Sequence, residues 1–199
     1  MSTTCNCETP ELEKSGPVGV QPKASTSTWA IDRVHSTAQF KVKHMMISNV
    51  LGEFASITGA LERDENDITK SKIRASIDAD TINTREPQRD AHLKSADFLD
   101  VENYPQITFT STRVDSVSPG QIRVTGNLTI RGVTQEVPLD VELGGHNMTP
   151  WGERKMGFSA TTQINRKDFG LNWNMAMEMG GMMVGDDIKI SIDGEATPL

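Results

Sequence analysis

The chain has 199 residues, a formal net charge of −7 and a pI near 5.1. An acidic protein is repelled by nucleic acids and by anionic membranes, so the composition argues against a nucleic-acid-binding protein. Nowhere does the chain approach the roughly eighteen consecutive apolar residues of a membrane-spanning helix. Its length suits a single domain.

Residues 1–27 are rich in Ser, Thr, Pro, Glu, Lys and Gly and contain few large apolar side chains. We expect them to form a flexible N-terminal tail before a folded domain of residues 28–199. The segment carries no positive charge before Lys14 and no apolar run, which predicts no secretory signal and a cytoplasmic location. Cys5 and Cys7 could bind a soft metal, but exposed thiols are the simpler interpretation because no histidine is near them in sequence.

Alternation of apolar and polar residues predicts strands throughout the remainder of the chain. In residues 121–130, for example, Ile122, Val124 and Leu128 lie on one side and polar residues on the other, as in a half-buried strand. The first strand is expected to bend around His35 and Ser36. The eight predicted strands cover residues 29–42, 54–61, 72–82, 106–114, 121–130, 136–143, 157–164 and 187–196.

Two segments have a different pattern and predict short helices near an opening of the fold. In residues 43–54, Met46, Val50 and Phe54 recur at a spacing of four, which is typical of an amphipathic helix. Residues 85–100 contain a proline near the start of a possible second helix.

Eight antiparallel strands with one wet face are expected to close on themselves, because closure removes exposed sheet edges. The all-β sequence therefore predicts an eight-stranded antiparallel β-barrel. Small residues are expected among the larger ones on the inner face, and a barrel with small interior residues can hold one elongated ligand. These small residues are Ala75, Ala79, Ala160 and Thr162.

The sequence lacks the common nucleotide-binding, hydrolase and zinc-protease motifs, so we expect neither an enzyme nor a bound metal or cofactor. Asp32, His35 and Ser36 could suggest nucleophilic catalysis, but a hydrogen-bonded trio at a strand bend is the simpler interpretation. The basic residues of segment 85–100 are interspersed with acidic ones and predict a solvated face, although one or two arginines could bind an anion.

Five motifs in the chain resemble those of the YceI-like family of lipocalin-like, polyisoprenoid-binding proteins. They occur in the order W-x-I-D-x-x-H-S, R-D-x-H-L-K-S-x-D-F, Y-P-x-I-T-F-x-S-T, G-x-L-T-I-R-G-V-T and R-x-D-F-G-L. The resemblance runs from about Trp29 to Ala196. It implies a bacterial protein whose extended barrel takes up an isoprenoid chain, such as a polyprenyl phosphate or a quinone tail, for transport, storage or sequestration. It also implies a possible homodimer, and many relatives are periplasmic.

Residues 172–185 contain five of the ten methionines, and three of them form an M-x-M-x-M pattern. Thioethers in such a pattern can bind Cu(I), but methionine also suits the surface around a flexible apolar ligand. With Gly180, Gly181 and Gly185 as hinges, we interpret the segment as a mobile flap over the barrel mouth.

The resulting hypothesis is a lipid carrier with an apolar tunnel. The alternatives are a copper- or zinc-binding protein or stress-related enzyme that uses His and Met, and an interaction module with a packed barrel. The residues predicted to contact the apolar chain are Phe40, Met46, Val50, Phe54, Ile77, Phe98, Phe109, Phe158, Phe169, Trp173, Met175, Met177, Met182 and Met183. His44, Arg89 and His92 are the candidates for contact with a polar head group.

Overall fold

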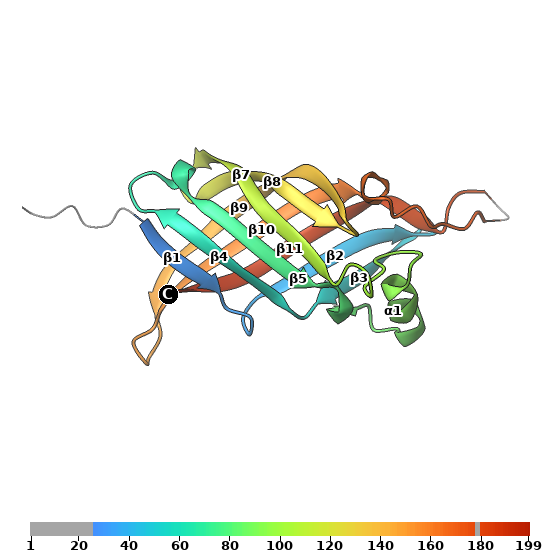
Figure 1. Cartoon of the computed structure of the whole chain (residues 1–199), viewed down its shortest axis with the longest axis horizontal. Coiled ribbons are helices and arrows are strands. Elements are labelled where there is room, and N and C mark those ends of the chain that lie inside the picture. The colour runs from blue at the N-terminus through green and yellow to red at the C-terminus, as the bar shows by residue number, and fades with distance from the viewer. Residues whose placement is uncertain (1–25, 178–179) are drawn as a thin grey trace, which may run out of the picture.

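The computed structural model describes residues 26–177 and 180–199 (Figure 1). Most of the predicted N-terminal tail therefore lies outside the described residues, and its last two positions, Thr26 and Ser27, belong to the first strand. Among the described residues, no helix combines the length and apolar character needed to cross a membrane.

In this part of the chain, eleven antiparallel strands form one sheet that closes on itself. The closed ring has the order β1-β4-β5-β7-β8-β9-β10-β11, with β11 pairing back onto β1. The strands are β1 (Thr26–Ile31), β2 (Thr37–His44), β3 (Ser48–Phe54), β4 (Ile57–Asp64), β5 (Lys72–Asp78), β6 (Ile82–Asn83), β7 (Gln106–Ser118), β8 (Gln121–Ile130), β9 (Val133–Met148), β10 (Arg154–Asn165) and β11 (Val184–Pro198).

Three wall strands are broken into two segments each, which reconciles eleven strands with an eight-stranded barrel. β1 and β2 are the halves of one strand, separated by the bend at residues 32–36, and β1 pairs with β4 while β2 pairs with β3. A short break separates β3 from β4, and a 3-10 turn separates β5 from β6. The predicted eight-stranded barrel and the bend in its first strand are confirmed.

The helix α1 (Pro87–Lys94) lies at one end of the barrel (Figure 1). Pro87 occupies its first turn, where a missing N–H costs nothing, and the Glu86 carboxylate accepts hydrogen bonds from the backbone N–H groups of Gln88 and Arg89. The second predicted helix is thus confirmed, although it is shorter than the segment that suggested it. Three 3-10 turns are η1 (Ile68–Lys70), η2 (Ala79–Thr81) and η3 (Arg166–Phe169).

The helix predicted for residues 43–54 is wrong, because this segment forms the hairpin between β2 and β3. Met45 and Met46 make its turn with positive φ angles of 51° and 60°. A spacing of four is also an even number, so Val50 and Phe54 share one face of a strand just as they would share one face of a helix. In the hairpin these two residues lie opposite Val42 and Ala38.

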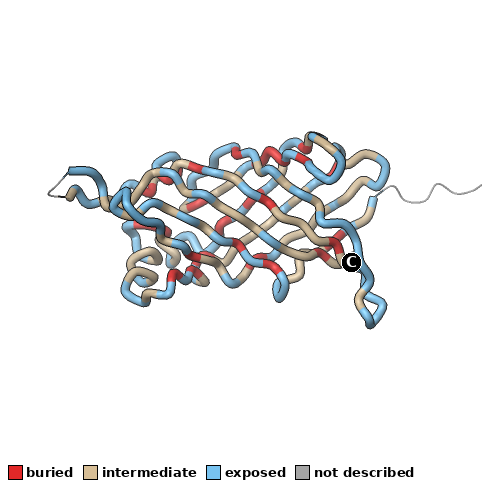
Figure 2. The backbone as a smooth tube through the Cα atoms, turned by 180° about the vertical axis from the view of Figure 1, so that it is seen from behind, coloured by how far each residue is buried: buried red, intermediate tan, exposed pale blue. Residues whose placement is uncertain are grey.

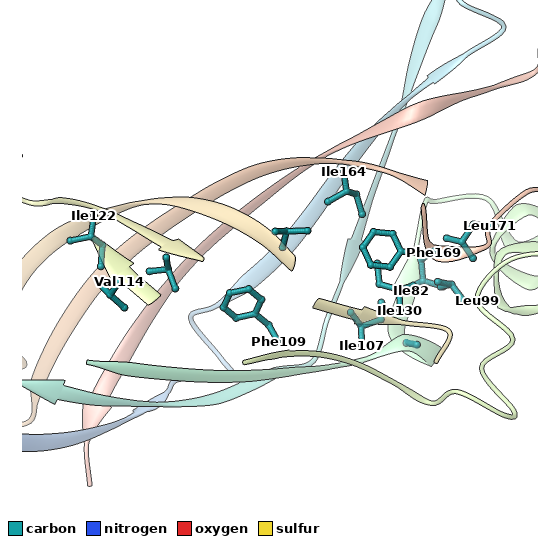
Figure 3. Packing of buried hydrophobic residues seen from close by; sticks show 13 residues of the cluster. Ile82, Leu99, Ile107, Phe109, Val114, Ile122, Ile130, Ile164, Phe169 and Leu171 are labelled. Carbon is teal, nitrogen blue, oxygen red and sulfur yellow. The ribbon is translucent and has the colours of Figure 1, made fainter. Parts of the chain in front are cut away.

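Buried and exposed residues alternate along the strands, because one face of each strand points into the barrel and the other into solvent (Figure 2). The largest buried cluster includes Phe109 in the middle of the barrel and Phe169 and Leu171 toward the α1 end (Figure 3). A smaller cluster of Trp29, Met156 and Ala196 lies at the opposite end. The ends of the barrel are therefore packed by different groups of residues, which we call the α1 end and the Trp29 end.

Candidate functional site

An apolar cavity of about 260 Å³ runs inside the barrel. Every second residue of β10 lines it, from Met156 near the Trp29 end, through Phe158, Ala160 and Thr162, to Ile164 near the α1 end. Nine residues of a strand, at about 3.3 Å each, span roughly 25 Å between the first and the last. The cavity is thus elongated along the wall and suits a chain-like ligand better than a compact one.

Small side chains account for the hollow. Ala75 lines the cavity, and its neighbours across the sheet are Gly59 on β4 and Phe109 on β7. On the far wall, Ile188 and Ile190 point inward but are only half-buried. Inward side chains retain accessible surface only where they border empty space, so the interior is not filled by the barrel's own residues.

Six residues predicted to contact an apolar chain line this cavity, and they come from five strands and from the segment that follows α1. They are Phe40, Phe54, Ile77, Phe98, Phe109 and Phe158. The rings of Phe40 and Phe54 lie 5.8 Å apart at the α1 half of the wall. The structure therefore brings together, around one space, side chains that are up to 118 positions apart in sequence, as a period-two pattern on a closed sheet requires.

The other predicted contact residues do not line the cavity. Met46 is 60% exposed in the β2–β3 turn. Val50 lies opposite Val42 near the tip of the same hairpin. Phe169 is fully buried in the packed cluster at the α1 end, and the half-buried Trp173 packs against His92 and Phe98. A direct role of these side chains in ligand binding stays a prediction.

The described parts of the methionine segment, residues 172–177 and 180–185, pair as a small hairpin that projects beyond the α1 end (Figure 1). The backbone N–H of Met183 donates to the carbonyl of Met175 at 2.9 Å, and that of Met177 donates to Gly181 at 3.1 Å. Met45 donates to the Met183 carbonyl at 2.7 Å, which joins this hairpin to the β2–β3 turn. Met175 and Met182 are about half exposed, and none of the four described methionines lines the cavity. Met179 lies outside the described residues.

The candidates for a polar head-group contact have other partners. Arg89 donates from Nε to Thr84 Oγ1 at 2.7 Å and from Nη2 to the Thr84 carbonyl at 2.8 Å, which ties α1 to the residue that follows β6. His92 Nε2 donates to Asp97 at 2.9 Å. His44 ends β2 opposite Ser48. None of the three lines the cavity, and their contact with a head group stays a prediction.

Two arginines that the sequence interpretation missed do reach the cavity. One is Arg166, which is 1% exposed and donates hydrogen bonds to the carbonyls of Leu171, Trp173 and Gly185 and to the carboxylate of Asp186. Burial lowers the pKa of Arg166, and Asp186 opposes the shift. Because its donors are satisfied by the protein, Arg166 holds the chain that leads into the methionine hairpin.

The other is Arg63, at the Trp29 end. It follows the inward positions Ile57, Gly59 and Leu61 of β4, so its phase in the strand points it into the barrel. Arg63 Nη1 donates to His146 Nε2 at 2.9 Å. The strand predicted for residues 54–61 stops two residues short of Arg63, and continuing its period of two would have given Arg63 the same inward phase.

At the Trp29 end, the Trp29 ring lies next to an imidazole and a guanidinium. Trp29 is 1% exposed, its ring centroid lies 5.4 Å from that of His146, and the guanidinium of Arg154 lies 5.3 Å from the Trp29 ring. Burial lowers the pKa of His146, and the charges of Arg63 and Arg154 lower it further. The lowered pKa favours the neutral form of His146, which can accept the hydrogen bond from Arg63.

Asp32, His35 and Ser36 do not form a catalytic triad. His35 Nδ1 donates to the Asp32 carboxylate at 3.0 Å, but Ser36 Oγ exchanges hydrogen bonds with the backbone of Glu195 rather than with His35. A nucleophilic serine needs its base within hydrogen-bonding distance. Lys155 also pairs with Asp32 and, with His35, holds the pKa of that carboxyl far below its ordinary value. Asp32 and His35 therefore bond to each other, and Ser36 joins the bend to β11. The three residues do not include a bonded Ser–His pair.

Comparison with known protein families matches residues 29–196 to the YceI-like domain. The chain belongs to the YceI-like family. UPF0312 proteins of Staphylococcus aureus strains MSSA476 and MW2 are each 38% identical to it over 170 residues, which cover 85% of this chain and 96% of each relative.

Solved structures support the same fold. The YCEI protein of Campylobacter jejuni is 33% identical, with a TM-score of 0.67, and the match covers 79% of this YceI-like chain and 90% of that one. BcnA of Burkholderia cenocepacia has a TM-score of 0.74 at 21% identity, over 84% and 99% of the two chains. A polyisoprenoid binding domain from Saccharophagus degradans has a TM-score of 0.61 at 14% identity, over 86% and 98%.

Proposed function

We propose that this YceI-like protein binds one long isoprenoid chain inside its barrel and serves in the transport, storage or sequestration of that lipid. The observation that carries the proposal is the elongated cavity, whose lining is almost wholly apolar along β10 and the facing strands. Membership of the YceI-like family supports it, and so does the similarity in fold to a domain described as polyisoprenoid binding.

The energetics favour a hydrocarbon ligand. Removing apolar surface from water contributes about 25 cal/mol per Å², so a chain of several isoprene units can bind tightly without a dense set of polar contacts. A polar ligand would be disfavoured in the middle of the tunnel, because Phe109, Val124 and Ile190 offer it no hydrogen bonds. The polar groups of the ligand must therefore lie at one end of the barrel.

The direct test is to purify the protein from its natural host without detergent and to identify bound lipid by mass spectrometry. The proposal expects one isoprenoid chain per barrel. Repeated recovery of empty protein that also takes up no added polyprenol would overturn it.

We further propose that the methionine hairpin contacts the part of the bound chain that reaches the α1 end. The hairpin joins the β2–β3 turn there and exposes flexible apolar side chains, which adapt to irregular ligands. Replacing the four described methionines of the segment with serine should slow uptake of a fluorescent polyprenyl chain and weaken its binding. Met148→Ser is the matched control, because Met148 is 63% exposed at the far end of β9. Equal uptake by both variants would remove the hairpin from the account.

A further inference from the structure

Arg63 is the charged side chain at the Trp29 end that both borders the cavity and keeps unused hydrogen-bond donors. Its Nε is buried, and among residues 26–177 and 180–199 it is the one buried side-chain nitrogen or oxygen without a hydrogen-bond partner. Nη1 contacts His146 Nε2 and the Met156 sulfur, the latter at 3.4 Å, and the described residues provide no hydrogen bond for Nη2. The Arg63 side chain as a whole is partly exposed, but a buried N–H without an acceptor is costly, so its Nε favours a ligand that brings one.

The surroundings of Arg63 favour an anion as that acceptor. Glu65 is the carboxylate that comes within ion-pair distance of Arg63 in the described chain, with 3.6 Å between Oε2 and Nε, and it accepts a hydrogen bond from Ser27. Arg154 adds a second positive charge above Trp29, and its field and that of Arg63 both act on Glu65 and His146. A neutral His146 accepts a hydrogen bond from Arg63 but adds no negative charge, so Glu65 is the one described carboxylate that opposes the two arginines here.

Within residues 26–177 and 180–199, the α1 end offers no equivalent site. Arg166 borders the cavity there, but its donors are used by backbone carbonyls and by Asp186, which also pairs with Lys167. Arg89 is engaged by Thr84 in the same way. Of the two arginines that line the cavity, Arg63 therefore keeps free donors for a charged group on a ligand, whereas the donors of Arg166 are used by the protein.

We propose that the ligand is an anionic single-chain amphiphile, whose phosphate or carboxylate lies against Arg63 while its tail runs along β10 toward α1. This inference rests on the proposed function and adds to it the charge of the head group and the direction of the chain. A guanidinium matches both oxyanions because its N–H donors form a planar fork. Phosphate and carboxylate lipids thus share the recognition chemistry, and the experiment distinguishes them.

The experiment measures binding of farnesyl phosphate, farnesol and palmitate to delipidated full-length protein by titration calorimetry. In the wild type, farnesyl phosphate or palmitate should bind more tightly than uncharged farnesol. Arg63→Met should weaken binding of the favoured acid by about tenfold to a hundredfold, the range expected for a charge-assisted hydrogen bond. Farnesol binding should change less than about threefold, which also reports that the barrel remains folded.

Arg74→Met is the matched control, because Arg74 lies on the solvent face of β5 opposite Ala60 and removes the same charge. Arg63→Lys, which keeps the charge but loses the planar fork, should fall between wild type and Arg63→Met. The inference is overturned while the proposed function stands if the three ligands bind alike, or if Arg63→Met and Arg74→Met have the same effect on the acids. If none of the three ligands binds the wild-type protein, both proposals fail.

Discussion

A mutation that enlarges a side chain facing the cavity distinguishes a hollow barrel from a packed one. Ala75 lines the cavity on β5 and is only half-buried, although it points into the barrel. Ala75→Leu adds three carbon atoms to this space. If the space is empty, the new side chain gains apolar contacts without displacing others.

The expected magnitude follows from the area that leucine buries. Each buried methylene contributes about 0.8 kcal/mol, so Ala75→Leu should stabilise the empty barrel by up to about 2 kcal/mol. The same atoms exclude part of a bound chain, which should weaken ligand binding by about 2 kcal/mol, or roughly thirtyfold in Kd. The variant should thus be more stable and bind less.

Urea denaturation of the ligand-free protein and titration with a polyprenyl chain measure the two effects. Ala79→Leu is the control, because Ala79 is 1% exposed within the packed cluster and does not line the cavity. Overpacking at that position should destabilise the fold by about 1–3 kcal/mol. The reasoning is refuted if Ala75→Leu destabilises the protein as much as Ala79→Leu, because the interior would then be full.

Three further variants test how the wall is held together. Arg166→Lys loses the fork that binds several carbonyls, so it should lower the unfolding free energy by about 2 kcal/mol or more in chemical denaturation. Gly59→Val places a Cβ 2.5 Å from the Arg74 carbonyl oxygen and should lower the urea midpoint by an amount equivalent to about 1–3 kcal/mol. The lowered pKa of Asp32 stabilises the fold above the unfolded carboxyl's pKa of about 3.9, and this contribution is lost as pH falls below that value. The stability advantage of wild type over Asp32→Asn should therefore shrink between about pH 7 and about pH 3, as measured by denaturation at both values.

Much of the barrel could be predicted from the sequence, because the inner and outer faces of a half-buried strand appear as alternating apolar and polar residues. The bend at residues 32–36 was visible as a polar interruption of that period. The hairpin at residues 43–54 was mistaken for a helix because Met46, Val50 and Phe54 fit both periods. Nothing local marks Met45 and Met46 as a turn with positive φ, a role that Gly or Asn usually fills.

The candidate site was less accessible to sequence reasoning. The alternation along the strands identified Phe109 and Phe158 as residues that line the cavity, since the position of a residue in a strand fixes the direction of its side chain. It could not show that Phe169 belongs to the packed end, because burial there depends on how η3 meets segments distant in sequence. No motif or cluster of charges marks Arg63 in the sequence, and only its phase in β4 places it inside the barrel.

Native mass spectrometry of delipidated protein mixed with a polyprenyl chain tests the hollow, chain-binding barrel most directly. We expect a single adduct per folded chain, strongly reduced in Ala75→Leu and unchanged in Arg74→Met. A wild-type protein that is folded and yet forms no adduct at any ligand concentration would contradict the account.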